Sequence, residues 1–574
     1  MTRQNRFLDD GFQTVELAVR HIASEKQSAV AREFEGCSAC LIVDSASISK
    51  WQHQALVDTC ERGLEITTVL WCDNTTTPKR PVKHAASHAL RLRPMSSDLT
   101  KSVPWGDLVG PSAEVIHFQS EWEGAWQRVP ASVGSKVGAR DVDLIVKFGM
   151  YLLRDPQDIP SRLGVLSFHH GNTPKYRGRP AGFYELMTGA DSVSAMVQRL
   201  NNNLDGGDVL ALGEYRVTPH SYRRVSRTLY ENSTLLLSKA IRNALRGEVL
   251  RLPTTGKNYR LPSNGTGARF VSRVGRAKLS RIAYGMTREK LWQIAQTAPI
   301  DLSTTHGLHH PTITRRYPVP KGYSFVADPG VLEDGSIVCE GMDRRTGLGQ
   351  LLVLDAADPR ALDTSGFGPG HLSYPFVVTD NDVSYLMPEM AGIGAQHIVR
   401  VGPGPSLGSV VPLAGLEAVR LVDPTVVKHG GRWWLFAGRS AATSADHLYL
   451  WSSDELLGPY REHPDNPIVI DPSCARPAGP IVAAGGELFR CGQDNRGSYG
   501  NGIVVRKIVS LTETTYREEP HAELRMREGF GPHTLIVRDG YAVVDWYEER
   551  FNPLAWLLRA KGRLPTSRAK PPAA

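Results

Sequence analysis

Residues 167–178 read SFHHGNTPKYRG, and residues 204–210 read LDGGDVL. The apolar run at 164–168 predicts a strand that ends at His169, and the sequence at 204–207 predicts a turn that carries Asp205. A histidine at the end of a strand, oriented by a carboxylate from a neighbouring loop, can accept a proton and stabilise an oxyanion. His169 and Asp205 are therefore the first candidates for a catalytic pair.

The segments before this stretch have the pattern of an open α/β sheet. Apolar runs at 38–44, 65–71, 113–118 and 142–146 predict strands, and residues 49–62 are compatible with a helix. Strand, helix and strand at this spacing predict a parallel sheet. A dinucleotide-binding fold needs a glycine-rich turn after the first strand, but residues 44–47 read DSAS, which disfavours NAD or FAD.

In the order of these motifs the sequence resembles the formyltransferase family, which includes methionyl-tRNA formyltransferases, glycinamide ribonucleotide transformylases and sugar N-formyltransferases. In that family a strand ends in Asn-x-His, a Pro-Lys-Tyr-Arg-Gly loop follows, and an Asp in a Leu-Asp-x-Gly turn comes about three dozen residues later. The resemblance covers roughly residues 38–250. It implies a Rossmann-like open sheet, 10-formyltetrahydrofolate as the formyl donor, and no metal.

The resemblance also implies roles for individual residues. His169 becomes the acid/base or oxyanion-stabilising residue, and Asp205 becomes its partner. Residues 143–153, DLIVKFGMYLL, match the strand and loop that wrap the pterin. The residues expected at the cofactor are Phe148, Gly149, Met150, Leu152 and Asn203. Arg177 either forms a structural salt bridge or binds an anionic substrate.

One residue departs from the family pattern, because Ser167 stands where the family has the Asn that helps to hold the formyl oxygen. A hydroxyl can donate one hydrogen bond, but it reaches less far than a carboxamide, and losing an oxyanion donor can cost on the order of 100-fold in rate. Asn172 offers a substitute amide or stabilises a turn. Three possibilities stay open: a rearranged transferase with Ser167 in a catalytic role, a slow or hydrolytic variant, and a protein that keeps the pocket without the reaction.

After Lys321 the sequence changes to short β-rich runs separated by Gly and Asp turns, and a repeat becomes visible. Five dipeptides recur at a spacing of about 50 residues, the size of one propeller blade. They are Asp328-Pro329, Tyr374-Pro375, Asp423-Pro424, Arg476-Pro477 and His533-Thr534. Five such units predict an all-β domain with the fold of a five-bladed β-propeller.

The repeats resemble the five-bladed propeller at the N-terminus of plant glucosamine inositolphosphorylceramide transferases and, more distantly, the propellers of glycoside hydrolases. The resemblance implies that the first strand of each blade lines a central cavity. The substrate-binding candidates there are Asp328, Glu389, Asp423, Arg476 and His533. Carboxylates in one funnel also suit glycosidic chemistry, so carbohydrate binding, hydrolysis and a structural role stay open.

The chain is therefore expected to be multidomain, α/β followed by all-β. Its expected parts are an N-terminal arm (1–37), a formyltransferase-like domain (38–250), a linker with a docking helix (251–320) and the propeller (321–574). We expect the docking helix within the basic amphipathic stretch 276–294.

Composition indicates a globular protein of the cytoplasm. Of 574 residues, 41% are hydrophobic and 22% are charged, which is ordinary for this class. The seven cysteines are scattered and follow no leader sequence, which indicates reduced thiols, and the CxxC of Cys37 and Cys40 lacks the second pair that a zinc site needs. No run of about 18 apolar residues is present, so no membrane span is expected.

Together these observations predict a folate-dependent formyltransferase acting on an amine of an amino sugar or glycan precursor, with the propeller binding the carbohydrate. A methionyl-tRNA formyltransferase is the first alternative. However, the net charge of +8 is spread along the chain without a concentrated basic stripe, so no nucleic acid partner is expected. The second alternative is a carbohydrate-binding or glycosyl-processing protein with a degenerate formyltransferase core. The sequence does not indicate an oligomeric state.

Overall fold

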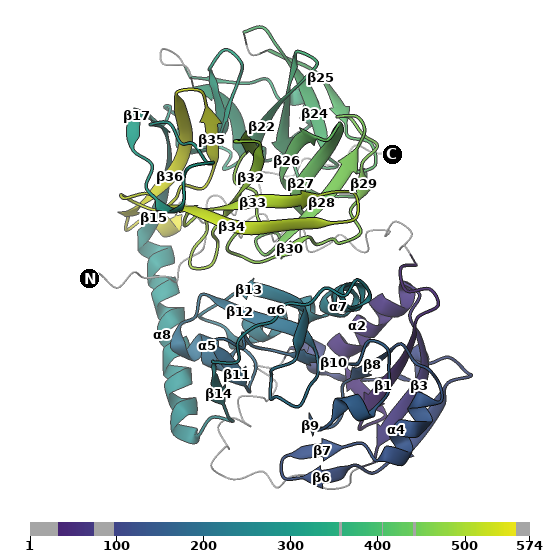
Figure 1. The fold of residues 1–574 in the computed structure, drawn as a ribbon. Coiled ribbons are helices and arrows are strands. Elements are labelled where there is room, and N and C mark those ends of the chain that lie inside the picture. The colour runs from purple at the N-terminus through teal and green to yellow at the C-terminus, as the bar shows by residue number, and fades with distance from the viewer. Residues whose placement is uncertain (1–31, 74–96, 355–358, 405, 440–442, 558–574) are drawn as a thin grey trace, which may run out of the picture. The chain divides into compact units, whose positions relative to one another are not determined.

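The structure is a computed structural model that describes residues 32–73, 97–354, 359–404, 406–439 and 443–557 (Figure 1). Most of the expected N-terminal arm, residues 1–31, lies outside the described residues. The described residues form two compact units that divide between Lys278 and Leu279. We call them the α/β unit, up to Lys278, and the sheet-rich unit, from Leu279 onward.

A seven-stranded sheet in the order β13-β12-β10-β8-β1-β3-β5 forms the centre of the α/β unit. Its strands are β1 (Ser38–Val43), β3 (Glu65–Cys72), β5 (Glu114–Phe118), β8 (Leu144–Lys147), β10 (Val165–His169), β12 (Ser192–Arg199) and β13 (Asp208–Arg216). The five strands from β10 to β5 are parallel, whereas β12 pairs antiparallel with β10 and with β13. Ligands of open α/β sheets bind at the carboxyl ends of the parallel strands, and β10 carries His169 to that edge.

Both faces of this sheet are covered by helices. On one face, α4 (Ala131–Gly138) packs Val133 and Val137 against the core side chains of β1, β8 and β10. On the other face, Trp51 of α2 (Lys50–Glu61) meets the ring of Phe168 edge-on at 4.9 Å. Successive strand residues point to opposite faces. Ser167 and His169 therefore point to the face opposite to that of Phe168.

The remaining elements up to α8 surround the sheet. They are α5 (Phe183–Thr188), α6 (Tyr222–Ser233), α7 (Leu236–Leu245), α8 (Asn264–Thr287), β2 (Ser47–Ser49), β4 (Ser102–Pro104), β6 (Glu121–Glu123), β7 (Trp126–Arg128), β9 (Leu152–Leu153), β11 (Tyr176–Gly178) and β14 (Lys257–Tyr259).

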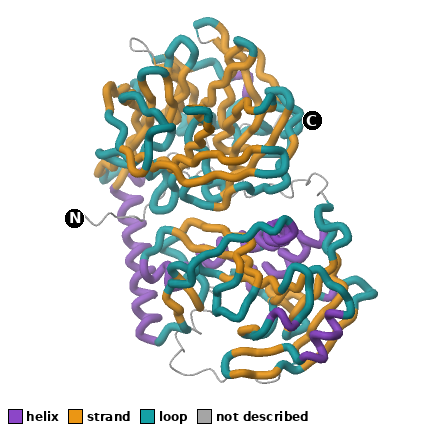
Figure 2. The backbone as a smooth tube through the Cα atoms, in the orientation of Figure 1, coloured by secondary structure: helices purple, strands orange, loops and turns teal. Residues whose placement is uncertain are grey.

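The sheet-rich unit contains five sheets of four or five strands each among its described residues, and strands make up most of it (Figure 2). The first three sheets are β18 (Tyr323–Val331), β19 (Ile337–Asp343), β20 (Gly349–Leu354) and β21 (Arg360–Ala361); β22 (Ser373–Asp380), β23 (Val383–Glu389), β24 (His397–Gly402) and β25 (Ser406–Pro412); and β26 (Leu421–His429), β27 (Arg432–Arg439), β28 (His447–Ser453), β29 (Arg461–Glu462) and β30 (Val469–Ile470). The fourth contains β16 (Gly307–His309), β31 (Val482–Ala484), β32 (Glu487–Gln493), β33 (Ile503–Leu511) and β34 (Tyr516–Leu524), and the fifth contains β15 (Arg288–Thr297), β17 (Ile313–Tyr317), β35 (Leu535–Arg538) and β36 (Tyr541–Phe551).

The fifth sheet corrects the linker expected over 251–320. The docking helix expected over 276–294 ends at Thr287, and the next residue begins β15. β15 pairs along its whole length with β36, from Arg288 opposite Phe551 to Thr297 opposite Ala542. The alternation of buried Trp292, Ile294 and Ala295 with more exposed neighbours is too short to identify a strand within a basic stretch, so the sheet-rich unit includes residues that the sequence assigns to a linker.

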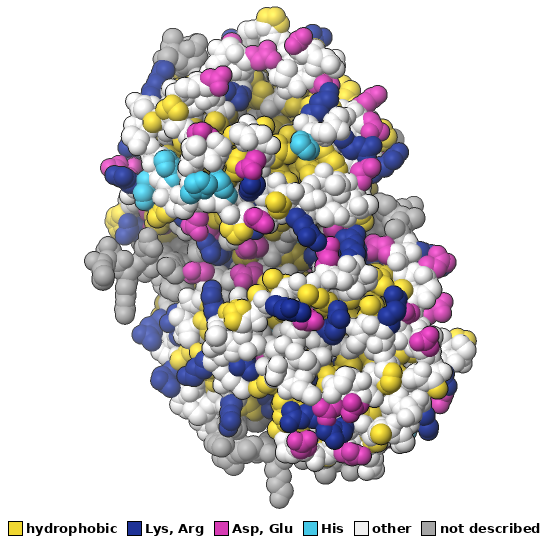
Figure 3. All heavy atoms as spheres, in the orientation of Figure 1, with side chains coloured by type: hydrophobic (Ala, Val, Ile, Leu, Met, Phe, Trp, Pro, Cys, Tyr) yellow, Lys and Arg dark blue, Asp and Glu magenta, His cyan; other side chains and the backbone are white. Residues whose placement is uncertain are grey.

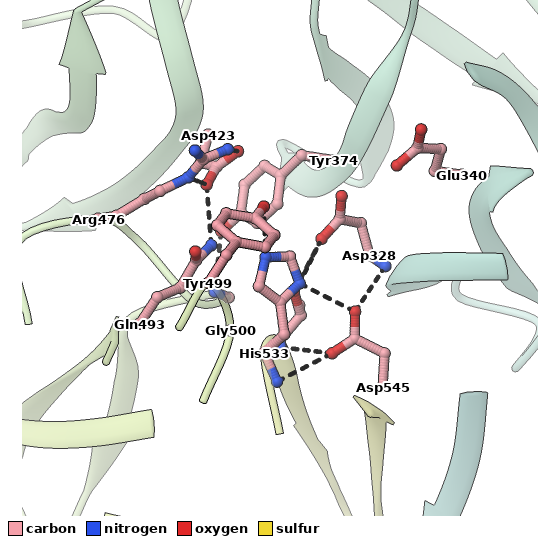
Figure 4. Close-up of polar contacts among 12 residues, drawn as sticks. Asp328, Glu340, Tyr374, Asp423, Arg476, Gln493, Tyr499, Gly500, His533 and Asp545 are labelled. Carbon is pink, nitrogen blue, oxygen red and sulfur yellow. Dashed lines mark hydrogen bonds and ion pairs between the residues drawn. The ribbon is translucent and has the colours of Figure 1, made fainter. Parts of the chain in front are cut away.

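The first strands of the first three sheets share one irregularity. Asp328, Tyr374 and Asp423, each followed by proline, have φ angles of 51°, 42° and 50°, and the strand register shifts at each of them. This left-handed region is unfavourable for residues with a side chain and persists only when the surroundings enforce it. The bulges turn all three side chains toward one another (Figure 4).

Candidate functional site

The α/β unit brings His169 and Asp205 together at the carboxyl edge of its sheet. His169 is the last residue of β10, and Asp205 lies in the turn between β12 and β13 with a φ of 55°. His169 Nδ1 lies 3.4 Å from Asp205 Oδ1, and the two side chains are only 13% and 15% exposed. This arrangement fixes the tautomer and the orientation of the imidazole.

The environment of His169 suits a proton acceptor. Burial lowers the pKa of His169, and the guanidinium of Arg177 acts in the same direction, although Asp205 opposes them. The imidazole is therefore neutral at pH 7, as a general base must be. Its Nε2 is buried and makes no hydrogen bond of ordinary geometry among the described residues, although the backbone of Tyr176 interacts with the ring and raises its pKa.

Arg177, a substrate-binding candidate, instead supports the Asp205 turn. Its Nη1 donates to the carbonyl of Thr254 at 3.0 Å and its Nη2 to the carbonyl of Leu204 at 2.8 Å. Its Nε lies 3.5 Å from Asp205 Oδ2. A planar guanidinium that joins the Asp205 turn to the carbonyl of Thr254 has the contacts of a positioning residue rather than of an anion receptor.

Ser167 lies on the same face of β10 as His169, two residues earlier. Its register partners are Lys147 on β8 and Gln198 on β12. Burial lowers the pKa of Lys147 to about 8, although Asp44 favours the charged form. Gln198 donates to the backbone carbonyl of Asp205 at 3.2 Å. The sequence motif does not single out Lys147 or Gln198; only the sheet register shows that they flank Ser167.

Asn172, the second candidate for the missing amide, is engaged elsewhere. Its Nδ2 donates to Glu214 Oε1 on β13 at 3.0 Å. The amide therefore bridges the loop after β10 to the edge strand. This contact is a third role for Asn172, besides the turn and the oxyanion donor that the sequence suggests.

The cofactor candidates at 148–152 follow β8 and pack in different ways. Phe148 stacks on Phe168 with ring centroids 6.0 Å apart. A Cβ on Gly149 would lie 2.5 Å from the backbone of β1, so only glycine fits there. Met150 donates its amide to the Asp44 carboxylate at 3.3 Å, and Leu152 is half-buried in β9.

Asn203, the remaining cofactor candidate, lies on an exposed loop that is joined to the loop after β9. The amide of Asn203 donates to Asn201 Oδ1 at 2.8 Å. Its neighbour Asn202 accepts from the amide of Asp155 at 2.8 Å and donates to the Asp155 carboxylate at 2.7 Å. These bonds hold the two loops together.

In the sheet-rich unit, His533 lies between two carboxylates (Figure 4). Its Nδ1 is 3.1 Å from Asp328 Oδ1 and 3.1 Å from Asp545 Oδ2, and its Nε2 is 2.7 Å from the Tyr499 hydroxyl. Although burial alone would lower the pKa of His533, Asp545 and Asp328 raise it to about 10. These three groups are close enough to hold a metal ion; without one, the two carboxylates favour the protonated imidazole.

Asp423 and Arg476 form a second buried pair in the same centre. The Arg476 guanidinium donates to both carboxylate oxygens of Asp423, at 2.5 and 3.2 Å. Gln493 donates to Asp423 Oδ2 at 2.9 Å, and the Asp423 amide donates to Glu389 at 3.1 Å. Burial raises the pKa of Glu389 well above its usual range and Asp423 adds to the effect, whereas Arg476, whose Nη2 lies 3.8 Å from Glu389 Oε2, opposes them.

The candidates expected around the propeller axis therefore lie together, but they bond mainly to one another. Asp328, Asp423, Arg476 and His533 are all less than 9% exposed. A cavity beside Asp328 and Tyr374 has a volume of about 10 Å³, which is room for about one water molecule.

Two buried groups around this network retain unused hydrogen-bonding atoms among the described residues, namely Gln493 Oε1 and Asn495 Nδ2. Glu340 Oε1 lies 3.5 Å from His371 Nε2, so these two side chains face each other. Burial raises the pKa of Glu340 well above its usual range, and Asp328 adds to the effect. No motif in the sequence marks Glu340, Asp545 or Tyr499, because the first two come from β19 and β36 and Tyr499 comes from the loop between β32 and β33.

The buried histidine and carboxyls make the stability of the sheet-rich unit depend on pH. The folded pKa of His533 exceeds its reference value of 6.5, so its contribution is full below pH 6.5 and is lost as pH rises toward 10. The raised pKa values of Glu340 and Glu389 act in the same direction from about pH 4.5 upward. We expect the free energy of unfolding of this unit to fall by a few kcal/mol, about 2–4, between pH 6.5 and 10.

Denaturant unfolding followed by tryptophan fluorescence at several pH values measures this dependence. The variant Asp545→Asn is expected to flatten the slope, whereas His309→Gln, whose imidazole lies outside this network, is the control and should keep it. Stability that stays constant or rises across this pH window would contradict the assignment of a buried imidazolium.

Different parts of the chain are similar to different known proteins, and the extent of the similarity differs. The family model "Glucosamine inositolphosphorylceramide transferase 1, N-terminal" matches residues 361–529. Glucosamine inositolphosphorylceramide transferase 1 of Oryza sativa subsp. japonica is 33% identical over 225 residues, 37% of this chain and 30% of the rice protein. Methionyl-tRNA formyltransferase of Agathobacter rectalis is 29% identical over 79 residues, 14% of this chain and 25% of that enzyme. A family-43 glycoside hydrolase structure is 15% identical with a TM-score of 0.29, covering 35% of this chain and 77% of that one.

These similarities relate two parts of the chain to two kinds of protein, and they assign no single family to the whole chain. The chain combines a mixed α/β unit with a sheet-rich unit, and it is similar in part to formyltransferases and in part to the N-terminal region of the plant transferase. It spans about a third of the length of the rice relative that it matches. None of the described helices is both long and apolar enough to cross a membrane.

Proposed function

We propose that this protein is a folate-dependent formyltransferase that moves a formyl group from 10-formyltetrahydrofolate to an amine, on an amino sugar or a glycan precursor. The observation that supports this proposal most strongly is the neutral His169 at the end of β10, directed by Asp205 and with Nε2 unpartnered among the described residues. A general base and an oxyanion donor are the two groups that acyl transfer to an amine needs.

We assign each residue at the sheet edge its own role in formyl transfer. The donor supplies a formyl carbon that is open to attack by the amine. His169 Nε2 accepts the proton of the attacking amine, while Asp205 stabilises the imidazolium that forms. Arg177 and Gln198 hold the backbone of the Asp205 turn. Ser167 and the neighbouring Lys147 lie on the same face of the sheet and provide donors for the developing negative charge on oxygen.

For the sheet-rich unit we propose that the five sheets are the blades of a five-bladed β-propeller that binds the sugar or its carrier. Two observations support this: the match of residues 361–529 to the plant transferase region, and the convergence of the five motif residues on a buried polar centre. Gln493 Oε1 and Asn495 Nδ2 retain hydrogen-bonding capacity there, which sugar hydroxyls can use. The pocket for the sugar must lie outside the closed Asp328–His533–Asp545 network.

A direct test mixes the purified full chain with 10-formyltetrahydrofolate and a panel of amino-sugar nucleotides. We expect one acceptor to gain the mass of a formyl group and tetrahydrofolate to appear in equal amount. Release of tetrahydrofolate with free formate only would indicate a hydrolase. Sugar binding by calorimetry without any consumption of the donor would instead favour a carbohydrate-binding protein with a degenerate core.

The role of Ser167 gives a separate prediction. If its hydroxyl replaces the family's amide, Ser167→Ala should lower kcat by about tenfold or more, whereas Ser167→Asn should be tolerated. Steady-state kinetics with the acceptor found above measures both. If both variants equal the parent, the oxyanion donor lies elsewhere, and Lys147→Met becomes the variant to compare, because Asn172 is bonded to Glu214.

A further inference from the structure

The sheet-rich unit contains a cavity of about 410 Å³ at the junction of its third and fourth sheets. One wall comes from residues 468–474, around β30 of the third sheet, and the other comes from β33 and β34 of the fourth. Sites for small molecules have volumes of about 300–1,000 Å³. This cavity is therefore large enough for a small organic ligand.

A bulge in β33 shapes one side of the cavity. Val509 has no partner across the ladder, because the pairing with β34 skips from Ile508 to Ser510. An extra residue of this kind bends its strand and redirects side chains. Val509 lines the cavity and is 50% exposed, so the cavity reaches solvent beside it.

The cavity continues the apolar core between the two sheets. Ile468, Val469 and Tyr516 line it. The same three side chains pack in the core cluster that contains Phe436 and Ile508. Tyr516 meets Phe436 edge-on with ring centroids 5.8 Å apart, which fixes the position of its ring. One side of the cavity is therefore apolar.

The polar side is built around the carboxylate of Glu518, which is only 6% exposed. Arg490 Nε and Nη2 donate to it at 2.8 and 2.7 Å, Arg506 Nε donates at 3.1 Å, and the Tyr516 hydroxyl donates at 2.5 Å. Although burial alone would raise the pKa of Glu518, Arg490 and Arg506 lower it. The ionised carboxylate holds the two guanidinium groups, which lie opposite each other on β32 and β33, in place before a ligand arrives. Groups that are already ordered lose little entropy on binding.

Hydrogen-bonding capacity remains on this polar side. Among the described residues, Arg506 bonds through Nε and Nη2 only, so its Nη1 can donate to a ligand. Asp471 Oδ1 accepts from the Ser473 amide at 2.8 Å, which leaves Oδ2 able to accept from a ligand. Arg517 and Glu519 also line the cavity and are exposed.

Charge around the cavity is balanced. Three guanidinium groups and three carboxylates line it or are bonded to its lining: Arg490, Arg506, Arg517, Asp471, Glu518 and Glu519. Arg496, which also interacts with Asp471, is bonded to Asp494 at 2.9 and 3.0 Å. On the face shown in Figure 3, acidic and basic side chains are likewise interspersed. A polyanion would meet as many carboxylates as guanidinium groups, whereas a sugar hydroxyl can both donate and accept.

We propose that this cavity binds an uncharged saccharide. This site rests on the proposed function, in which the sheet-rich unit holds the sugar of the acceptor, and it is separate from the buried Asp328–His533–Asp545 network. The C–H groups of a sugar ring contact the apolar side, at Val469 and Val509. Its hydroxyls accept from Arg506 and donate to Asp471.

Ligand-observed NMR of the full chain with a panel of neutral hexoses, pentoses, N-acetylhexosamines and their disaccharides identifies a binding sugar, and calorimetry then measures its Kd. Uronic acids and sugar phosphates are the charged counterparts in the panel. Val509→Trp places an indole in the cavity, and we expect it to weaken binding on the order of tenfold or more. Arg506→Gln should weaken binding on the order of tenfold, because it removes a charge-assisted hydrogen bond.

Two substitutions elsewhere in the unit are matched controls. Val411→Trp changes a valine of β25 that is 39% exposed, and Arg345→Gln changes an arginine that is 90% exposed beside Asp343. Both should bind the sugar like the parent. Far-UV circular dichroism and urea denaturation of every variant separate loss of the site from loss of the fold.

Three results would overturn the proposal: no neutral sugar binds the parent, binding requires a carboxylate or a phosphate on the sugar, or Val509→Trp and Arg506→Gln bind the sugar like the parent. Formyl transfer by the same variants distinguishes failure of this site from failure of the proposed function. An active parent whose KM for the acceptor is unchanged in both variants has its sugar site elsewhere. Sugar binding that both variants lose, in a parent that never consumes 10-formyltetrahydrofolate, keeps this site and refutes the transferase.

Discussion

Substituting alanine for His169 is expected to lower kcat for formyl transfer by about 1,000-fold, with the fold intact. The side chain supplies the proton acceptor, and general base catalysis contributes about 10²- to 10⁴-fold. It is nearly buried but small, and its Nε2 has no partner among the described residues, so its removal leaves no new unpaired donor there. Single-turnover measurement of formyl transfer isolates the chemical step.

Asp205→Asn should produce a loss of similar size, because an amide can no longer stabilise the imidazolium. The α/β unit offers a matched control for both variants. His117 Nδ1 lies 2.9 Å from Asp73 Oδ2 in a pair that is about half exposed, and His117→Ala and Asp73→Asn should leave turnover unchanged. Turnover within threefold of the parent, about 0.7 kcal/mol of barrier, in His169→Ala or Asp205→Asn would refute the catalytic assignment.

Arg476→Met is expected to lower the free energy of unfolding of the sheet-rich unit by about 3–5 kcal/mol. Removing one partner of a buried ion pair leaves the other charge desolvated and uncompensated. Here the abandoned group is Asp423, which is 2% exposed and receives both guanidinium bonds. Urea denaturation followed by tryptophan fluorescence measures the change.

Two further variants make this prediction specific. Arg345→Met removes an arginine that is 90% exposed beside Asp343, and it should change stability by less than about 0.5 kcal/mol. Adding Asp423→Asn to Arg476→Met should recover part of the loss, because the uncompensated charge disappears. If Arg476→Met unfolds like the parent but no longer binds the acceptor, the guanidinium serves recognition rather than the fold.

The sequence predicted that His169 and Asp205 lie together because both residues stand in motifs with fixed neighbours. His169 follows an apolar strand, and Asp205 lies in a turn whose glycines are required by close contacts: a Cβ on Gly207 would lie 2.2 Å from the carbonyl oxygen of Arg199. The register that brings Lys147 and Gln198 beside Ser167 is a property of strand pairing, and no local pattern encodes it. The same holds for the contact of Asn172 with Glu214, which are 42 residues apart in the chain.

The sequence predicted only some of the residues in the polar centre of the sheet-rich unit. Dipeptides at regular spacing identified Asp328, Tyr374 and Asp423, which occupy the same bulge in the first strands of three sheets. They also identified Arg476 and His533, which lie in the segments before β31 and β35. Asp545 and Glu340 come from β36 and β19, and the sequence does not show which carboxylate will meet His533. The sequence also does not show that these groups form hydrogen bonds and ion pairs with one another. Burial and hydrogen bonding depend on side chains from several sheets.

The pairing of β15 with β36 sets the order in which the protein can assemble during synthesis. Residues 38–245, which contain the sheet and helices of the α/β unit, leave the ribosome first and can fold while translation continues. The fifth sheet cannot form at that stage, because β15 emerges about 250 residues before its partner strand and has an unpaired edge in the meantime. A nascent chain stalled before Tyr541 is therefore expected to have a protease-resistant N-terminal portion and a sheet-rich portion that depends on chaperones.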